Sequence, residues 1–134
     1  LPVVVTWAVD TAAYTGGRAF GRRKMAPAIS PNKTVEGGIS GLLAGPFAAL
    51  AWTLIALPDL AAVAGMGRIA LLGLLLAAAA ILGDLVESSL KRECGVKDSS
   101  QLLPGHGGLL DRMDSLLWTI PVAWFFLHFL TPVG

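Results

Sequence analysis

Charged side chains are concentrated in one short segment that lies between two long apolar stretches. This segment runs from Ser88 to Asp114 and combines basic residues with carboxylates. They include Lys91, Arg92, Lys97, Arg112, Asp98, Asp111 and Asp114. Basic side chains bind phosphate oxygens, whereas carboxylates bind hard divalent cations such as Mg²⁺. Their combination beside apolar segments predicts a metal-dependent phosphate site at a membrane surface.

The end of this segment could bring two carboxylates together. Asp111 and Asp114 are three residues apart, so they share one face if a helix begins there, and Arg112 points away from that face. In the preceding PGHGG sequence, Gly107 and Gly108 allow backbone N–H groups to approach a phosphate. The alternative is a glycine-rich linker before a helix whose dipole favours Asp in its first turn. His106 could bind a phosphate or move a proton, or only form a local hydrogen bond.

A polar stripe follows the third apolar stretch of the chain. Its members recur at the spacing of one helix face and are Asp84, Glu87, Ser88 and Lys91. We expect this stripe to face protein or water, because an ionised Asp84 at that depth is costly unless it is paired or binds a cation. A cation shared with Asp111 and Asp114 would satisfy Asp84. An ion pair with Lys91 or Arg92 is the alternative.

Further polar groups lie nearer the start of the chain. Basic residues that flank a span usually set topology and contact headgroups, which is the more frequent role for Arg22, Arg23 and Lys24. Short donors are more specific than diffuse charge, so we expect substrate binding at Ser30, Asn32, Lys33 and Thr34. Asp10 lies within the first apolar stretch. It is either a further metal or water ligand or a structural hydrogen-bond acceptor.

The composition indicates which elements position these groups. The chain has 134 residues, of which 54% are hydrophobic and 14% charged, and its mean hydropathy is +0.69. These values indicate an integral membrane protein rather than a soluble domain. Apolar stretches predict four membrane-spanning helices at 1–17, 37–58, 69–83 and 115–134, with the third continuing towards Lys91. We therefore expect an all-α polytopic bundle in which residues 1–134 form a single membrane-embedded catalytic domain.

The distribution of basic residues predicts the orientation of this bundle. Every Lys and Arg except Arg68 falls within 18–33 or 91–112, which places both connections, and the chemistry, on the cytoplasmic side. The single Cys94 excludes an internal disulfide framework. No Walker loop, HExxH motif or nucleic-acid signature is present. Small residues at 37–45 could serve either homodimer contacts or packing within one chain.

Several sequence motifs together resemble one family. From Ser88 onward the order SLKR, KD, LPGHGG and DRMD resembles the motif of the phosphatidate cytidylyltransferases, and the upstream segments VDTAAYTGGRAFGRRK and ISPNKTVEGG are also similar to that family. The resemblance implies an integral enzyme of the bacterial inner membrane that condenses CTP with phosphatidic acid, giving CDP-diacylglycerol and pyrophosphate, with Mg²⁺ and room for a second cation. Members have further membrane helices before this point. We therefore expect these residues to be the carboxy-terminal part of a longer enzyme.

The resemblance and the charge pattern together define a set of expected site residues. The expected catalytic residues are Asp84, Lys91, Arg92, Lys97, Asp98, His106, Asp111 and Asp114. The expected substrate-binding residues are Ser30, Asn32, Lys33, Thr34, Ser88, Gly107, Gly108 and Arg112. The expected metal ligands are Asp84, Asp111 and Asp114. Two alternatives stay open, namely a related CTP-dependent transferase that acts on an ether-lipid phosphate, and a cation-coupled transporter with Asp10 and Asp84 along its path.

Overall fold

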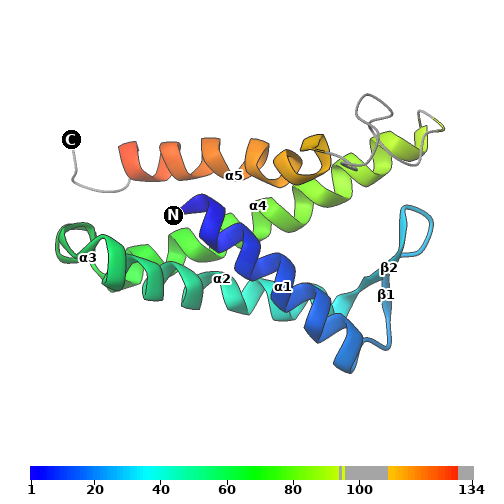
Figure 1. Cartoon of the computed structure of the whole chain (residues 1–134), viewed down its shortest axis with the longest axis horizontal. Coiled ribbons are helices and arrows are strands. Elements are labelled where there is room, and N and C mark those ends of the chain that lie inside the picture. Colours follow the sequence, from blue (N-terminus) through cyan, green and yellow to red (C-terminus); the bar gives the residue numbers. More distant parts are fainter. Residues whose placement is uncertain (94, 96–108, 130–134) are drawn as a thin grey trace.

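The computed structural model describes residues 1–93, 95 and 109–129, with only the backbone described for 109–114. Helices make up most of this part of the chain, and one short hairpin joins the first two of them (Figure 1). In chain order the elements are α1 (Pro2–Phe20), β1 (Lys24–Ala26), β2 (Ser30–Thr34), α2 (Val35–Ala56), α3 (Pro58–Ala64), α4 (Met66–Glu93) and α5 (Leu109–Phe129).

Two helices are long and apolar enough to cross a membrane. They are α2, with 22 residues, and α4, with 28 residues. At about 1.5 Å of rise per residue they are roughly 33 and 42 Å long, which exceeds the hydrocarbon thickness of about 30 Å. The apolar part of α5 with described side chains, Ser115–Phe129, is shorter. The structure therefore confirms a mainly helical protein with two candidate membrane spans, and the four-span bundle stays a prediction.

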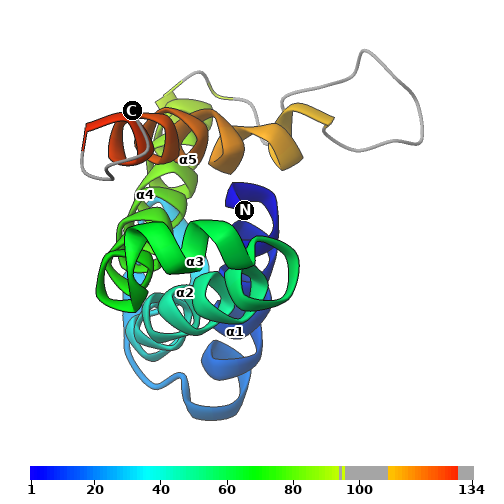
Figure 2. The same cartoon turned by 90° about the vertical axis from the view of Figure 1, so that its left-hand side faces the viewer.

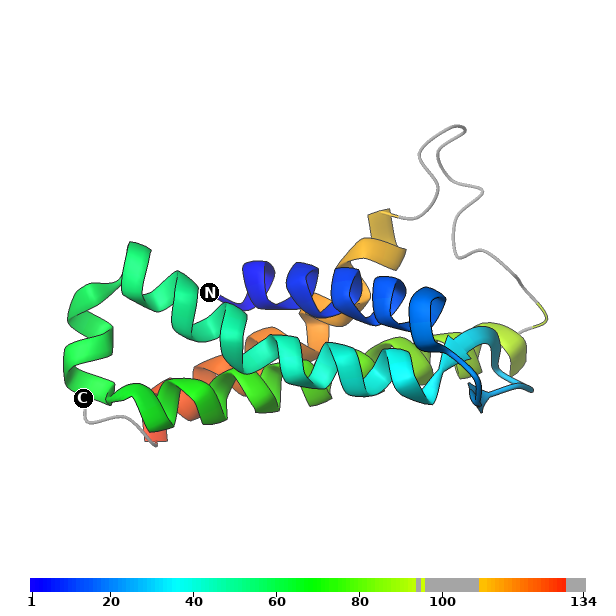
Figure 3. The same cartoon turned by 90° about the horizontal axis from the view of Figure 1, so that it is seen from below.

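Several elements begin or end at the same end of the bundle. Figures 1 and 3 show the end of α1, the start of α2 and the end of α4 at one end of the molecule, together with the β1–β2 hairpin. The short helix α3 lies at the opposite end, and α5 packs along α4 on the side away from α2 (Figure 2). The polar end of α4 and the basic hairpin segment thus meet at the same end, as the sequence predicts.

Glycine permits the helices to pack closely. A Cβ atom on Gly45 of α2 would lie 2.5 Å from the carbonyl oxygen of Gly73 on α4, and a Cβ on Gly73 would lie 2.6 Å from the carbonyl oxygen of Gly45. A Cβ on Gly37 would lie 2.5 Å from the carbonyl oxygen of Ala13 on α1. These small residues therefore serve packing within the chain, as small residues do between membrane helices. A homodimer stays a prediction.

The core is apolar, and large apolar side chains also point outward. Val5, Val9, Leu72, Leu76 and Phe126 are 0–2% exposed. A buried hydrogen bond of 3.4 Å joins the Thr6 and Thr119 hydroxyls of α1 and α5. Many other large apolar residues are exposed, among them Phe47, Ile55 and Leu117. This outward-facing apolar surface suits contact with lipid, where backbone groups are satisfied within helices.

The connection from 18 to 36 contains a β-hairpin, whereas the sequence predicts an all-α bundle. β1 and β2 pair antiparallel, with Lys24 opposite Thr34 and Ala26 opposite Ser30. Pro27 and Pro31 each lack a backbone N–H, which disfavours a helix and leaves the extended hairpin as the better solution. The Thr34 hydroxyl accepts a hydrogen bond from the Gly37 N–H at 3.2 Å, so the hairpin runs directly into the N-cap of α2.

Candidate functional site

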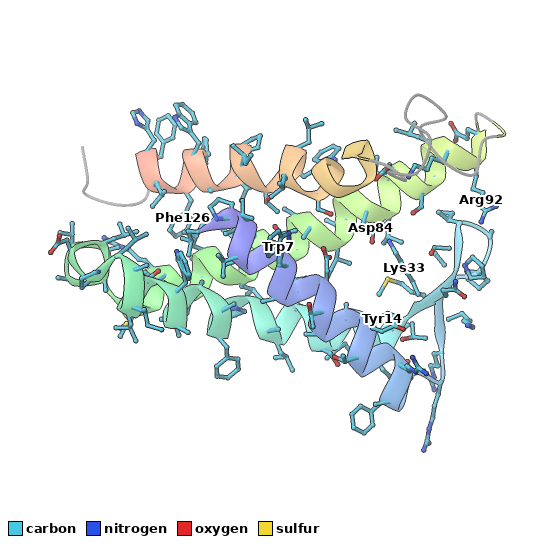
Figure 4. All side chains as sticks on the ribbon, in the orientation of Figure 1. Trp7, Tyr14, Lys33, Asp84, Arg92 and Phe126 are labelled. Carbon is cyan, nitrogen blue, oxygen red and sulfur yellow. The ribbon has the colours of Figure 1, made fainter. Side chains whose placement is uncertain are left out.

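A cleft of about 640 Å³ opens at the hairpin end of the bundle. Three structural units contribute its polar lining, namely one face of α1, the hairpin, and one carboxylate from α4. The polar and charged lining residues are Asp10, Tyr14, Arg18, Lys24, Ser30, Asn32, Lys33, Thr34 and Asp84. Five of the residues expected from sequence, at 30, 32, 33, 34 and 84, are therefore brought together in this one cleft. Figure 4 shows three of the lining residues at this end of the molecule, Tyr14, Lys33 and Asp84.

An ion pair within the cleft joins the hairpin to α4. Lys33 Nζ lies 2.5 Å from Asp84 Oδ2, and the side chains are 25% and 42% exposed, respectively (Figure 4). The Lys33 Nζ atom itself is shielded from solvent. The sequence predicts Lys91 or Arg92 as the alternative ion-pair partner of Asp84, whereas the structure shows Lys33 in that role. Sequence reasoning missed this pair because the two residues lie on different elements, and helical spacing relates only residues on the same helix.

The other polar residues near the end of α4 make contacts outside the cleft. Lys91 forms an ion pair with Glu87, one turn away on the same helix. The Ser88 hydroxyl donates to the Asp84 backbone carbonyl at 2.8 Å, and Arg92 Nε donates to the Ile29 carbonyl in the hairpin turn at 3.2 Å. Among the residues that the structure describes, Ser88, Lys91 and Arg92 lie outside the lining of the cleft. The three contacts named here tie α4 to itself and to the hairpin.

The α1 face of the cleft supplies residues that the expected site omits. Asp10, Tyr14 and Arg18 are spaced four residues apart, so they lie along one face of α1. Arg18 Nη1 donates to the Tyr14 hydroxyl at 3.2 Å. This spacing was visible in the sequence and could have identified the face. Lys24, assigned above to topology, also lines the cleft, whereas Arg22 lines a separate hollow with Glu36.

Part of the expected site lies outside the described side chains. Lys97, Asp98, His106, Gly107 and Gly108 fall in the segment that the structure does not describe. Asp111, Arg112 and Asp114 are described by backbone alone, within the first turns of α5. The expected helix at Asp111 and Asp114 is confirmed, and their role as metal ligands stays a prediction.

The cleft offers oxygen donors that fit a hard cation. Asp10 and Asp84 supply carboxylates, and the Asp84 carboxylate already has a cationic partner in the ammonium group of Lys33. Carboxylate oxygens are also the protein ligands that Mg²⁺ prefers. Within the described ranges, no group of three or more His, Cys, Asp or Glu residues could hold a metal ion. The further ligands predicted from the sequence, Asp111 and Asp114, have side chains outside the part that the structure describes.

Comparison with known proteins gives one consistent family. The model of the cytidylyltransferase family matches residues 1–130. The phosphatidate cytidylyltransferase of Haemophilus influenzae is 45% identical over 126 residues, which cover 94% of this chain and 44% of that protein. The phosphatidate cytidylyltransferases of Bacillus subtilis and Synechocystis sp. are also 45% identical, over 124 and 133 residues, covering 92% and 95% of this chain and 45% and 42% of those proteins. The chain spans less than half the length of these relatives.

Proposed function

Because this chain belongs to the cytidylyltransferase family, we propose that it forms the catalytic part of a phosphatidate cytidylyltransferase. In this reaction an oxygen of the phosphatidate phosphate attacks the α-phosphorus of CTP. The bond from that phosphorus to the β-phosphate oxygen breaks, and pyrophosphate leaves. The products are CDP-diacylglycerol and pyrophosphate. No covalent enzyme intermediate is needed, because the lipid phosphate is itself the nucleophile.

The observation that carries this proposal is the mixed charge of the cleft. Arg18, Lys24 and Lys33 line it together with Asp10 and Asp84. Two anionic substrates repel each other, so an enzyme that joins them must supply positive charge at the point where they meet. The volume of about 640 Å³ lies within the range of small-molecule sites, roughly 300–1,000 Å³. The cleft thus has the size and the charge to hold a nucleoside triphosphate beside a lipid phosphate.

We propose one role for the carboxylates and another for the basic and hydrogen-bonding side chains. Asp84, Asp111 and Asp114 would hold Mg²⁺, and Asp10 would be a further metal or water ligand. Bound Mg²⁺ neutralises triphosphate charge and favours departure of pyrophosphate. Lys33 and Arg18 would bind phosphate oxygens, while Ser30, Asn32 and Thr34 would orient the nucleotide through short donors. Additional contacts are proposed for Lys91, Lys97, Asp98, His106, Gly107, Gly108 and Arg112.

The proposed setting is a bacterial inner membrane with the cleft on the cytoplasmic side. Four helices, α1, α2, α4 and α5, would cross the bilayer. The bundle end that carries the cleft also holds the basic residues of the hairpin and of the last turn of α4, whereas Arg68 lies near the start of α4, towards the other end. This asymmetry supports the orientation through the positive-inside rule. A cleft at the membrane surface suits a substrate whose phosphate is in the headgroup layer and whose tails are in lipid.

The test is pyrophosphate release from CTP by the purified protein in detergent. We expect release that requires both phosphatidic acid and Mg²⁺ and that stops when either is withheld. A protein that contains this chain within the full length of its relatives is assayed beside it, because the chain spans less than half the length of those relatives. Release that needs an ether-lipid phosphate instead of phosphatidic acid would change the substrate, and absence of release from both folded proteins would overturn the proposal.

A further inference from the structure

Lys33 is held more firmly than a surface lysine. It lies in β2, one residue before Thr34, whose hydroxyl caps α2 through the Gly37 N–H. Its Nζ is shielded from solvent and lies 2.5 Å from Asp84 Oδ2. The ammonium group is therefore enclosed in the cleft and engaged by the Asp84 carboxylate. The same Asp84 carboxylate is the one proposed to bind Mg²⁺.

We propose that the ammonium group of Lys33 competes with a divalent cation for Asp84. This inference rests on the proposed function, which supplies the cation and the triphosphate. Before a cation binds, Lys33 neutralises Asp84 and holds its carboxylate in the cleft. Once Asp84 has a divalent cation as its partner, the ammonium group is repelled and is free to donate to phosphate oxygens in the same cleft.

The exchange makes cation binding and phosphate binding depend on one another. While it is paired with Asp84, Lys33 has its charge satisfied and offers little to a triphosphate. A cation at Asp84 releases that charge towards the phosphates. Because such coupling is reciprocal, nucleotide that engages Lys33 also frees Asp84 and strengthens cation binding. Lys33 thereby links the two binding events through one side chain.

A competing ammonium group predicts opposite effects on the two ligands when Lys33 is removed. In Lys33→Met, Asp84 loses its competitor, so Mn²⁺, which shares the octahedral oxygen preference of Mg²⁺, should bind more tightly. An ion pair that is partly exposed contributes little, so the expected gain is about threefold to fivefold. Binding of CTP in the presence of saturating Mn²⁺ should weaken instead, because one phosphate donor is gone.

The experiment is a titration of Mn²⁺ into the purified chain in detergent, with free Mn²⁺ measured by electron paramagnetic resonance and no nucleotide present. Lys33→Arg keeps a cationic partner for Asp84 and should bind Mn²⁺ like the wild type. Lys24→Met removes a positive charge from the same cleft but leaves the Lys33–Asp84 pair intact. Its increase in affinity for Mn²⁺ should therefore be smaller than that of Lys33→Met. Combining Asp84→Asn with Lys33→Met should abolish the gain. Helical circular dichroism and a single gel-filtration peak verify the fold of each variant.

Each result is decisive. Tighter Mn²⁺ binding in folded Lys33→Met, lost in the double variant, supports the competition. Unchanged or weaker Mn²⁺ binding in folded Lys33→Met overturns it, as does a gain in Lys24→Met as large as that in Lys33→Met. These outcomes are separate from failure of the proposed function, which would appear as wild-type protein that releases no pyrophosphate from CTP whatever its affinity for Mn²⁺.

Discussion

Arg92 on α4 and Ile29 in the hairpin turn are 63 residues apart in sequence, yet Arg92 Nε donates a hydrogen bond of 3.2 Å to the Ile29 carbonyl. Figure 4 shows the Arg92 side chain extending from the end of α4 towards the hairpin. The hairpin carries Lys33, and α4 carries Asp84. This bond therefore helps to hold together the two elements whose side chains pair in the cleft.

Removing this link should loosen the hairpin. In Arg92→Leu we expect faster amide hydrogen exchange across residues 24–34, by up to about tenfold, because one hydrogen bond contributes about 0.5–1.5 kcal/mol. Exchange followed by mass spectrometry measures this directly. Arg68→Leu, at the start of α4, is the matched control and should leave the hairpin unchanged. Equal exchange in Arg92→Leu and the wild type would show that the bond does not anchor the hairpin.

Close packing of α2 against α4 should not tolerate a methyl group. Gly45→Ala would place a Cβ 2.5 Å from the Gly73 carbonyl oxygen, so the helices must move apart. We expect a loss of about 1–3 kcal/mol in the free energy of unfolding, which is typical of overpacking. Thermal unfolding in detergent, followed by circular dichroism, measures the change. Gly67→Ala is the control, since a Cβ there has nothing within 4 Å, and a loss of the same size in both variants would contradict the packing argument.

The α1 face of the cleft should affect substrate binding more than the chemical step. Arg18 lines the cleft and contacts Tyr14, whereas Arg22 lines a different hollow. Arg18→Gln should raise KM for CTP or phosphatidic acid at least about tenfold, since a hydrogen bond to a charged group contributes about 1.5–3 kcal/mol. Arg22→Gln should change KM little. Steady-state kinetics on both variants test this, and equal effects would assign Arg18 to general surface charge.

The sequence could predict contacts between residues of one helix, but not contacts between residues of two different elements. The apolar stretches at 37–58 and 69–83 correspond to α2 and to the apolar part of α4, because membrane helices are set by local composition. Helical spacing likewise placed Asp84 and Glu87 on one stripe. The same reasoning missed the Asp84 partner, Lys33, because that contact joins a strand to a helix 51 residues further along the chain.

The hairpin and the role of the α1 face could not be predicted from local sequence either. A strand of three residues, Lys24–Ala26, has too short a pattern to be distinguished from a loop. Its pairing with Ser30–Thr34 depends on the prolines and on the helix cap that follows. Tyr14 and Arg18 had the correct spacing in the sequence, but only the fold shows that this face of α1 lines the same cleft as Asp84.

The measurement that tests the central claim most directly is transfer of label from [α-³²P]CTP into chloroform-soluble lipid by wild-type protein and by Asp84→Asn, in the longest form of the protein that is active. The change removes one carboxylate charge from the cleft at nearly constant volume. Asp59→Asn on α3, at the opposite end of the bundle, removes the same charge far from the cleft. We predict lipid labelling by the wild type and Asp59→Asn and at least a hundredfold loss, about 2.7 kcal/mol, in folded Asp84→Asn. Near-normal labelling by Asp84→Asn would contradict the assignment of this cleft as the catalytic site.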